Sequence, residues 1–227
     1  AKGVVKNMTD IKHMKAHISM QAESYDLGFV TCMIDESIMN QYAVPRGIKI
    51  DGDFGMDGSK YSGDFTALEG KGIVKGNGRF DGNNMTYAAS LNITELQLHH
   101  FMPQDSLYAF TGEVNVKGKG TDFMSKNSWL NASADIKKFQ YGHWNLDKVN
   151  AVATLKSGVA HADIDSKNPI LDGIITLDAL LDKKDVELTF SADLRKADLY
   201  HLRLLDRPFN TSMCAHLDFS TNLKDKH

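Results

Sequence analysis

The 227-residue sequence contains little cysteine, little proline and no long apolar run. Its two cysteines, Cys32 and Cys214, lie far apart and outside any C-x-x-C or metal-ligand spacing. They could form a disulfide, but burial of each as a small hydrophobic side chain is the stronger expectation. The apolar runs are only a few residues long, whereas a membrane-spanning helix needs about 20. The sequence therefore predicts neither a disulfide-stapled fold nor a transmembrane helix.

A strong charge of either sign is also missing. Lys and Arg number 26 against 29 Asp and Glu, which gives a formal net charge of −3, and no basic cluster stands out. This balance excludes the electrostatic footprint of a nucleic-acid-binding protein. Residues 1–6 lack the apolar stretch of a signal peptide. We therefore expect that a targeting segment has been removed or that the sequence is part of a longer protein.

Apolar residues alternate with polar ones in several segments, and this period of two is typical of half-buried β-strands. The clearest segments are residues 85–93, 149–155 and 186–194, with shorter runs at 48–50, 114–116 and 174–175. Helical periodicity is weak, and the best candidate is a short helix at residues 33–39. The fold class predicted is therefore all-β, with at least about ten strands in a meander.

Clusters of Gly, Asn and Asp separate these segments and predict hairpin turns, because such residues tolerate a positive φ. The predicted turns are Asp57-Gly58, Asn77-Gly78, residues 81–84 and residues 182–185.

The sequence also contains an internal repeat. A shift of 103 positions places Tyr87 on Phe190, Ala89 on Ala192 and Leu91 on Leu194, and it continues to place residues 114 and 116 on 217 and 219. The approximate repeats lie near residues 72–120 and 173–223 of one elongated β-repeat segment, 1–227. The matched residues are apolar and of one parity, so the repeated feature is a buried sheet face rather than a catalytic residue. Because no linker separates the copies, a continuous sheet with stacked strands explains the pattern better than two tandem domains.

Motifs for catalysis and cofactor binding are scarce. Gly70-Lys71-Gly72 lacks the Ser or Thr that follows Lys in a phosphate-binding loop, and no G-x-S-x-G motif occurs. Residues 51–58 suggest a calcium loop, but Gly55, Met56 and Ser62 occupy positions where an EF-hand needs an oxygen ligand, Gly and Glu. The sequence therefore predicts a non-enzymatic protein without a cofactor.

Two groups of polar and aromatic residues admit a second interpretation. His161, Asp163 and Asp165 would share one face of a strand and could form a metal-binding edge, although a water-facing polar surface is the better interpretation. His99 and His100 would point to opposite faces of a strand, so they could not chelate together. Trp129, Phe139, Tyr141 and Trp144 crowd one region of the sequence, where they could stack on a sugar or pack at a sheet edge. A carbohydrate-binding or adhesive β-sandwich is therefore the alternative function.

Two stretches of the chain resemble the repeats of TamB-like proteins, members of the AsmA-like superfamily of bridge-forming envelope proteins. Residues 87–112 combine a strand, a turn at 96–101 with Pro103, and a return to Thr111-Gly112. Residues 129–179 run through Phe139-Gln140-Tyr141 to the segment Asn168-Pro169-Ile170-Leu171-Asp172-Gly173. The order and spacing of these motifs carry the resemblance, which is closest to the long Bacteroidetes type and extends over residues 11–219.

The resemblance implies an elongated sheet curled along its length into an open trough, a β-taco, with an apolar concave face. It also implies a periplasmic protein anchored in the inner membrane, which carries phospholipid or outer-membrane protein segments in outer-membrane biogenesis. A partner of the TamA type would bind regions outside this chain, which would be an internal segment.

An acyl chain needs only apolar contact, and alternating strands provide a continuous apolar strip. We therefore expect a set of apolar residues of one parity to line the lipid groove, although the same alternation would also suit the core of a closed sandwich. The predicted lining residues are Tyr87, Ala89, Leu91, Val149, Ala151, Ala153, Leu188, Phe190, Ala192 and Leu194.

Overall fold

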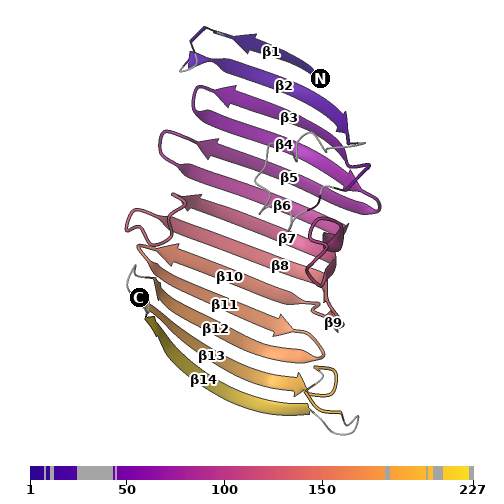
Figure 1. Ribbon diagram of the computed structural model, residues 1–227, viewed down its shortest axis with the longest axis vertical. Helices are drawn as coiled ribbons and strands as arrows, with labels where there is room; N and C mark the ends of the chain where they lie inside the picture. The colour runs from indigo at the N-terminus through magenta and orange to yellow at the C-terminus, as the bar shows by residue number, and fades with distance from the viewer. Residues whose placement is uncertain are drawn as a thin grey trace. The chain divides into compact units, whose positions relative to one another are not determined.

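Fourteen antiparallel strands form one sheet, as a computed structural model shows (Figure 1). The structure describes residues 1–7, 9–10, 13–24, 43, 45–181, 185–202, 204–206 and 212–224. Consecutive strands are neighbours in the sheet, except that the two-residue β9 pairs only with β8, so that β10 follows β8 in the order. The order has two ends, β1 and β14, so the sheet is open. The all-β prediction is confirmed.

The chain divides into two compact units. Unit 1 comprises residues 1–113 and 138–145, and unit 2 comprises residues 114–137 and 146–227. Unit 1 contains the strands β1 (Lys2–Lys6), β2 (Lys15–Glu23), β3 (Lys49–Asp57), β4 (Lys60–Glu69), β5 (Gly72–Asp81), β6 (Thr86–Gln97) and β9 (Trp144–Asn145), and the 3-10 helix η2 (Leu98–His100). Unit 2 contains β10 (Val149–Lys156), β11 (Val159–Lys167), β12 (Leu171–Leu181), β13 (Asp185–Asp198) and β14 (Ser212–Lys224). The strands β7 (Leu107–Lys119) and β8 (Trp129–Tyr141) contribute to both units.

The alternating segments of the sequence form strands as predicted. Residues 86–93 lie in β6, residues 149–155 in β10 and residues 186–194 in β13. Gly58, with a φ of 56°, lies in the turn between β3 and β4, and residues 82–85 form the turn between β5 and β6. These turns allow short hairpins, because their residues accept backbone conformations that most side chains avoid.

The predicted turn at Asn77-Gly78 is wrong, because both residues lie inside β5. The glycines of this strand serve packing instead of chain reversal. A Cβ atom on Gly76 would lie 2.6 Å from the ring of Phe65 on β4 and 2.7 Å from Leu91 on β6. The missing side chain therefore leaves room for a neighbouring aromatic ring, a role that glycine plays in strands where another group approaches closely.

Other predictions fall on parts of the chain that the structure does not describe. The helix predicted at residues 33–39 and Cys32 lie outside the described residues, and so does most of the turn predicted at 182–185.

The internal repeat corresponds to a succession of three strands. Strands β5, β6 and β7 match β12, β13 and β14, and both sets follow one another in the same order in the sheet. The repeated unit is therefore a group of neighbouring strands, as the sequence shift predicts.

Candidate functional site: an apolar sheet face

In unit 1, the strand register gathers apolar residues on one face of the sheet. Tyr87 lies opposite Phe80, and Ile93 lies opposite Val74, which in turn lies opposite Ala67. The same parity continues through β3, β2 and β1. The apolar face of unit 1 consists of Val5, Ala16, Ile18, Met20, Ala22, Ile50, Phe54, Met56, Tyr61, Phe65, Ala67, Val74, Phe80, Tyr87, Ala89, Leu91 and Ile93, with Gly3, Gly52, Gly63, Gly76 and Gly78 between them.

Unit 2 has a face of the same kind. Ala151 lies opposite Ile164, which lies opposite Ile175, and Ile175 lies opposite Ala192. The apolar face of unit 2 consists of Leu130, Ala132, Ala134, Ile136, Val149, Ala151, Ala153, Leu155, Ala160, Ala162, Ile164, Ile175, Leu177, Ala179, Leu188, Phe190, Ala192, Leu194, Ala215, Leu217 and Phe219, with Ser166, Gly173 and Thr221 near its margins.

All ten predicted lining residues belong to these two faces. Tyr87, Ala89 and Leu91 lie side by side on β6 in unit 1. The other seven lie on β10 and β13 of unit 2, where β11 and β12 separate them. Alternation along single strands identified these residues. It could not show which strands are neighbours, or that β1–β5, β8, β11, β12 and β14 also contribute to the faces. The repeat contained part of that signal, because it also matches β7 to β14.

Among the described residues, no second layer covers the apolar faces. The described residues form a single sheet, and only five apolar side chains among them are buried: Ile93, Leu96, Leu155, Ala192 and Ala197. Large side chains on the apolar faces stay half-exposed, such as Tyr61 with 48% and Phe219 with 58% of its surface accessible. In a sandwich, a facing sheet would bury these side chains.

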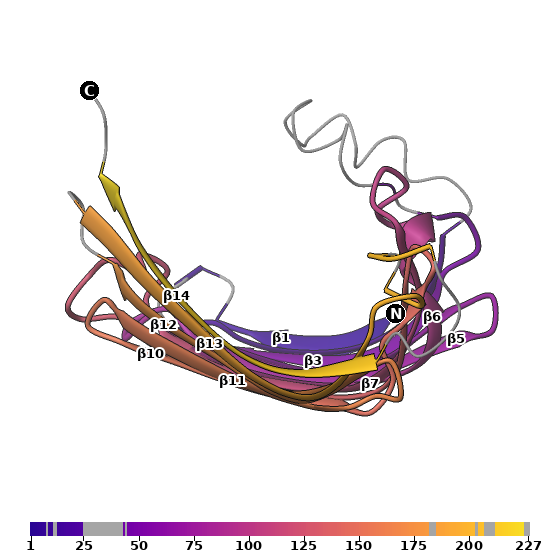
Figure 2. The same ribbon diagram turned by 90° about the horizontal axis from the view of Figure 1, so that it is seen from below.

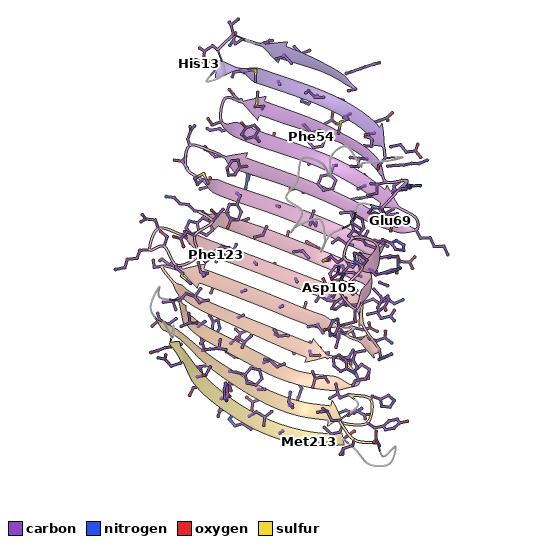
Figure 3. All side chains as sticks on the ribbon, in the orientation of Figure 1. His13, Phe54, Glu69, Asp105, Phe123 and Met213 are labelled. Atoms are coloured by element: carbon purple, nitrogen blue, oxygen red, sulfur yellow. The ribbon has the colours of Figure 1, made fainter. Side chains whose placement is uncertain are left out.

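The strands in each unit are bent along their length, so that the part of the sheet in each unit has a concave side (Figure 2). Figure 3 shows Phe54, a member of the apolar face of unit 1, on the near side of the sheet, which is the concave side in Figure 2. The apolar side chains of unit 1 therefore line the inside of the bend.

The opposite face of unit 2 carries charged residues that pair across strands. On β11, Nδ1 of His161 lies 2.7 Å from a carboxylate oxygen of Asp178 and its Nε2 lies 3.0 Å from one of Asp163, and Thr176 donates to Asp163 at 2.9 Å. The hydrogen bonds to Asp178 and Asp163 raise the pKa of His161. The hydrogen bonds from Thr176 and His161 lower the pKa of Asp163. We call this arrangement an Asp–His–Asp box.

A second Asp–His–Asp box joins β13 and β14. His216 bonds to Asp193 at 2.5 Å and to Asp218 at 2.8 Å, and both bonds raise its pKa. Hydrogen bonds from Ser191 and His216 lower the pKa of Asp218. In both boxes, a His-x-Asp segment of one strand lies opposite a Thr-x-Asp or Ser-x-Asp segment of its neighbour. Strand register decides which segments meet, so the sequence interpretation missed this pattern.

The metal-binding edge suggested by His161, Asp163 and Asp165 does not form as one cluster. The three residues share a face of β11, but Asp165 pairs with Arg195 at 3.5 Å rather than with His161. Within the described ranges, no group of three His, Cys, Asp or Glu side chains is arranged to hold a metal ion.

The histidine pair at residues 99 and 100 differs from its prediction. These residues lie in η2 rather than in a strand, so their rings do not point to opposite faces, and the ring centroids are 4.1 Å apart. His100 Nδ1 also lies 2.5 Å from Oε1 of Glu69, whose side chain is nearly buried at the end of β4. The contact between His100 and Glu69 joins η2 to the sheet.

The aromatic cluster is smaller than the sequence suggests. Tyr141 lies 5.8 Å from Trp144 and 6.5 Å from Phe139 between ring centroids. Trp129 begins β8, whereas Phe139 and Tyr141 lie near its end, so Trp129 is not part of the cluster. The rings pack against one another, and Tyr141 is the exposed member, with 41% of its surface accessible.

A depression of about 510 Å³ lies in unit 1, on the face opposite the apolar residues. Most of its lining is polar, including Asp51, Asp53, Asp64, Lys75 and Asn77. The depression therefore belongs to the water-facing side of the sheet.

Comparison with known proteins gives no match: no family model, no curated protein and no solved structure is similar to the chain. Across the described part of the chain, no helix has the length and apolar character needed to cross a membrane. The function must therefore be inferred from the sheet itself.

Proposed function

We propose that the chain is a non-enzymatic segment of a TamB-like envelope protein, whose apolar faces carry or shield lipid acyl chains in outer-membrane biogenesis. The observation that supports this proposal is the apolar face in each unit, which no second layer of the described residues covers. Such faces on soluble proteins are usually buried by another element, and a large exposed apolar patch marks a site of interaction.

Acyl chains suit this surface because they require apolar contact and nothing else. Covering hydrocarbon contributes about 0.8 kcal/mol for each CH₂ group removed from water. An unpaired polar group in the path would cost about 1–3 kcal/mol. The residues that define the apolar faces include no charged side chain. In unit 2, the hydroxyl of Ser166 is satisfied by the carbonyl oxygen of Leu171.

The spacing of the strands makes each face continuous. Neighbouring strands lie about 4.8 Å apart, so a row of directly paired residues presents one apolar side chain at each such step. In unit 2, one such row runs through Ala153, Ala162, Leu177, Phe190 and Phe219. A flexible hydrocarbon chain can follow this row across the strands without meeting a charge.

The cellular setting of the proposal rests on the resemblance to TamB-like proteins. On this proposal, the chain lies in the periplasm, as part of a protein anchored in the inner membrane. The cargo is phospholipid or outer-membrane protein segments, and a TamA-type partner binds regions outside this chain.

Photo-crosslinking tests the proposal directly. A photoreactive amino acid at Leu91 or Phe190 should capture phospholipid, because both side chains lie on the apolar faces. The matched controls are Asn92 and Thr189, the adjacent residues on the opposite face. Equal labelling at all four positions, or no lipid at Leu91 and Phe190, would contradict the proposal.

Carbohydrate binding is the alternative, and the exposed ring of Tyr141 next to Trp144 is the observation that favours it. A sugar would stack on that ring. If this alternative holds, a glycan array should give a signal that disappears with Trp144→Ala, and the lipid crosslinks at Leu91 and Phe190 should be missing.

A further inference from the structure

The loop that joins β7 to β8 in unit 2, residues 120–128, presents two adjacent apolar side chains to the solvent. Phe123 is 44% and Met124 43% exposed, and Figure 3 shows Phe123 at one margin of the sheet. Single exposed apolar residues are common on protein surfaces, whereas a cluster of them marks a site of interaction. The neighbours of this pair therefore decide its meaning.

Further apolar side chains lie at the same margin of unit 2. Val159, which begins β11, lies opposite Leu180 at the end of β12, and both are exposed. On its other side Val159 lies opposite Lys156, which lies opposite Trp129 at the start of β8. These residues have the parity opposite to that of the apolar face of unit 2, so they form a separate surface. We call it the apolar margin of unit 2, and it consists of Phe123, Met124, Trp129, Val159 and Leu180.

Hydrogen bonds order the loop that carries Phe123 and attach it to this margin. The carboxylate of Asp122 accepts the backbone N–H of Met124 at 3.1 Å. Ser157, in the turn between β10 and β11, donates from its backbone N–H to the carbonyl oxygen of Ser128 at 3.1 Å and from its hydroxyl to that of Lys126 at 2.9 Å. A surface that is already ordered loses little conformational entropy when it binds.

The apolar margin has a positively charged rim. Lys119, Lys126 and Lys156 are exposed there, and within the described part of the chain none of them forms an ion pair. Residues 119–128 and 156–159 together contain these three lysines against one carboxylate, that of Asp122. This local excess of positive charge contrasts with the formal net charge of −3 of the whole chain.

We propose that the apolar margin docks unit 2 on the surface of a bilayer that contains anionic lipids. Surface binding of this kind combines apolar side chains that enter the boundary between headgroups and acyl chains with lysines that are attracted to anionic headgroups. Phe123 and Met124 supply the first part and the three lysines the second. Tryptophan, here Trp129, is enriched at membrane interfaces. The inference goes beyond the proposed function, because it uses neither of the apolar faces.

Vesicle sedimentation tests the apolar part of this surface. The chain should pellet with vesicles of phosphatidylcholine and phosphatidylglycerol, and the double variant Phe123→Ser/Met124→Ser should bind them at least about tenfold more weakly. The matched control is Leu204→Ser/Leu205→Ser, an adjacent apolar pair that is also exposed but lies at the opposite margin. Residues 198–207 around it contain two arginines and two aspartates, so their charges balance.

The control pair should leave vesicle binding unchanged. An equal loss in both double variants would overturn the proposal, because any exposed apolar pair would then suffice. A wild-type chain that does not pellet with the anionic vesicles would also overturn it, in favour of a protein partner at this margin.

A second test concerns the lysines. Lys119→Gln, Lys126→Gln and Lys156→Gln should each weaken binding to the anionic vesicles about fivefold. Vesicles of phosphatidylcholine alone should bind the wild type more weakly, and added NaCl should weaken its binding to the anionic vesicles, since salt screens the attraction. The control is Lys196→Gln, an exposed lysine of β13 near the opposite margin, which should leave the affinity unchanged. Equal effects at Lys196 and at the three rim lysines would overturn the placement of the docking surface.

Discussion

Gly76 shows how a single missing side chain determines local packing. The ring of Phe65 and the side chain of Leu91 occupy the space that a Cβ atom on this residue would need. Asn77-Gly78, next to it, has the composition of a hairpin turn, and a local pattern cannot reveal that neighbouring strands supply rings to cover the backbone. The turn prediction at Asn77-Gly78 is therefore wrong because the conformation there depends on packing against neighbouring strands, and the sequence of β5 alone does not contain that information.

We predict that Gly76→Ala destabilises the protein by about 1–3 kcal/mol, because the added methyl group overpacks the site against Phe65 and Leu91. The matched control is Gly78→Ala, since a Cβ atom there would lie 3.7 Å from its nearest neighbour, the carbonyl oxygen of Ala88. Urea unfolding measures both free energies of unfolding. Equal losses for the two variants would show that the ring does not limit the space at Gly76.

The Asp–His–Asp boxes predict a dependence of stability on pH. Because its partners raise the pKa of His161 above 6.5 in the folded protein, the box contributes its full stabilisation below pH 6.5. That contribution is lost as the pH rises through the folded pKa. Asp163 works in the opposite direction: its lowered pKa stabilises the fold above pH 3.8, and the effect is lost as the pH falls through the folded value.

NMR titration and urea unfolding check this prediction. Asp178→Asn should lower the pKa of His161, because it removes the largest cause of the shift. His161→Asn should reduce the difference in urea midpoint between pH 6 and pH 8.5. An unchanged difference in that variant would mean that the box does not couple to folding.

At the scale of single strands, alternation is sufficient to predict β6, β10 and β13, because each buries one side only. It does not determine the partners, since any two strands with the same alternation could pair. Register decides which polar residues meet, and for this reason the boxes at His161 and His216 could not be predicted. The bend of the strands likewise depends on the whole unit rather than on one segment.

The two faces of β10 should respond differently to truncation. Leu155 on the apolar face is 7% exposed, whereas Val152 on the opposite face is 52% exposed. We expect Leu155→Ala to cost about 2 kcal/mol of unfolding free energy, near the lower limit for buried leucine, because among the described residues no second layer covers the site. Val152→Ala should change it by less than about 0.5 kcal/mol. Urea unfolding that shows equal costs would argue against a one-sided strand.

At the scale of the whole molecule, the proposed function depends on a lipid path without charge. Ala153→Asp introduces a carboxylate into the apolar face of unit 2, and the unpaired charge should cost at least about 1 kcal/mol in lipid binding. Lipid that co-purifies should therefore fall at least about fivefold, as measured by mass spectrometry. The matched control, Thr154→Asp, adds the same charge on the opposite face. An equal decrease in both variants would not support a path along the apolar face.

Nearly all strand pairing in each unit joins segments that follow one another along the chain, and this has a consequence for the order of folding. Most new strands need only the hairpin before them, so the long connections that must close are few, chiefly residues 24–48 between β2 and β3 and residues 199–211 between β13 and β14. A chain synthesised from its N-terminus can therefore add most strands one at a time, before its C-terminal part has been made.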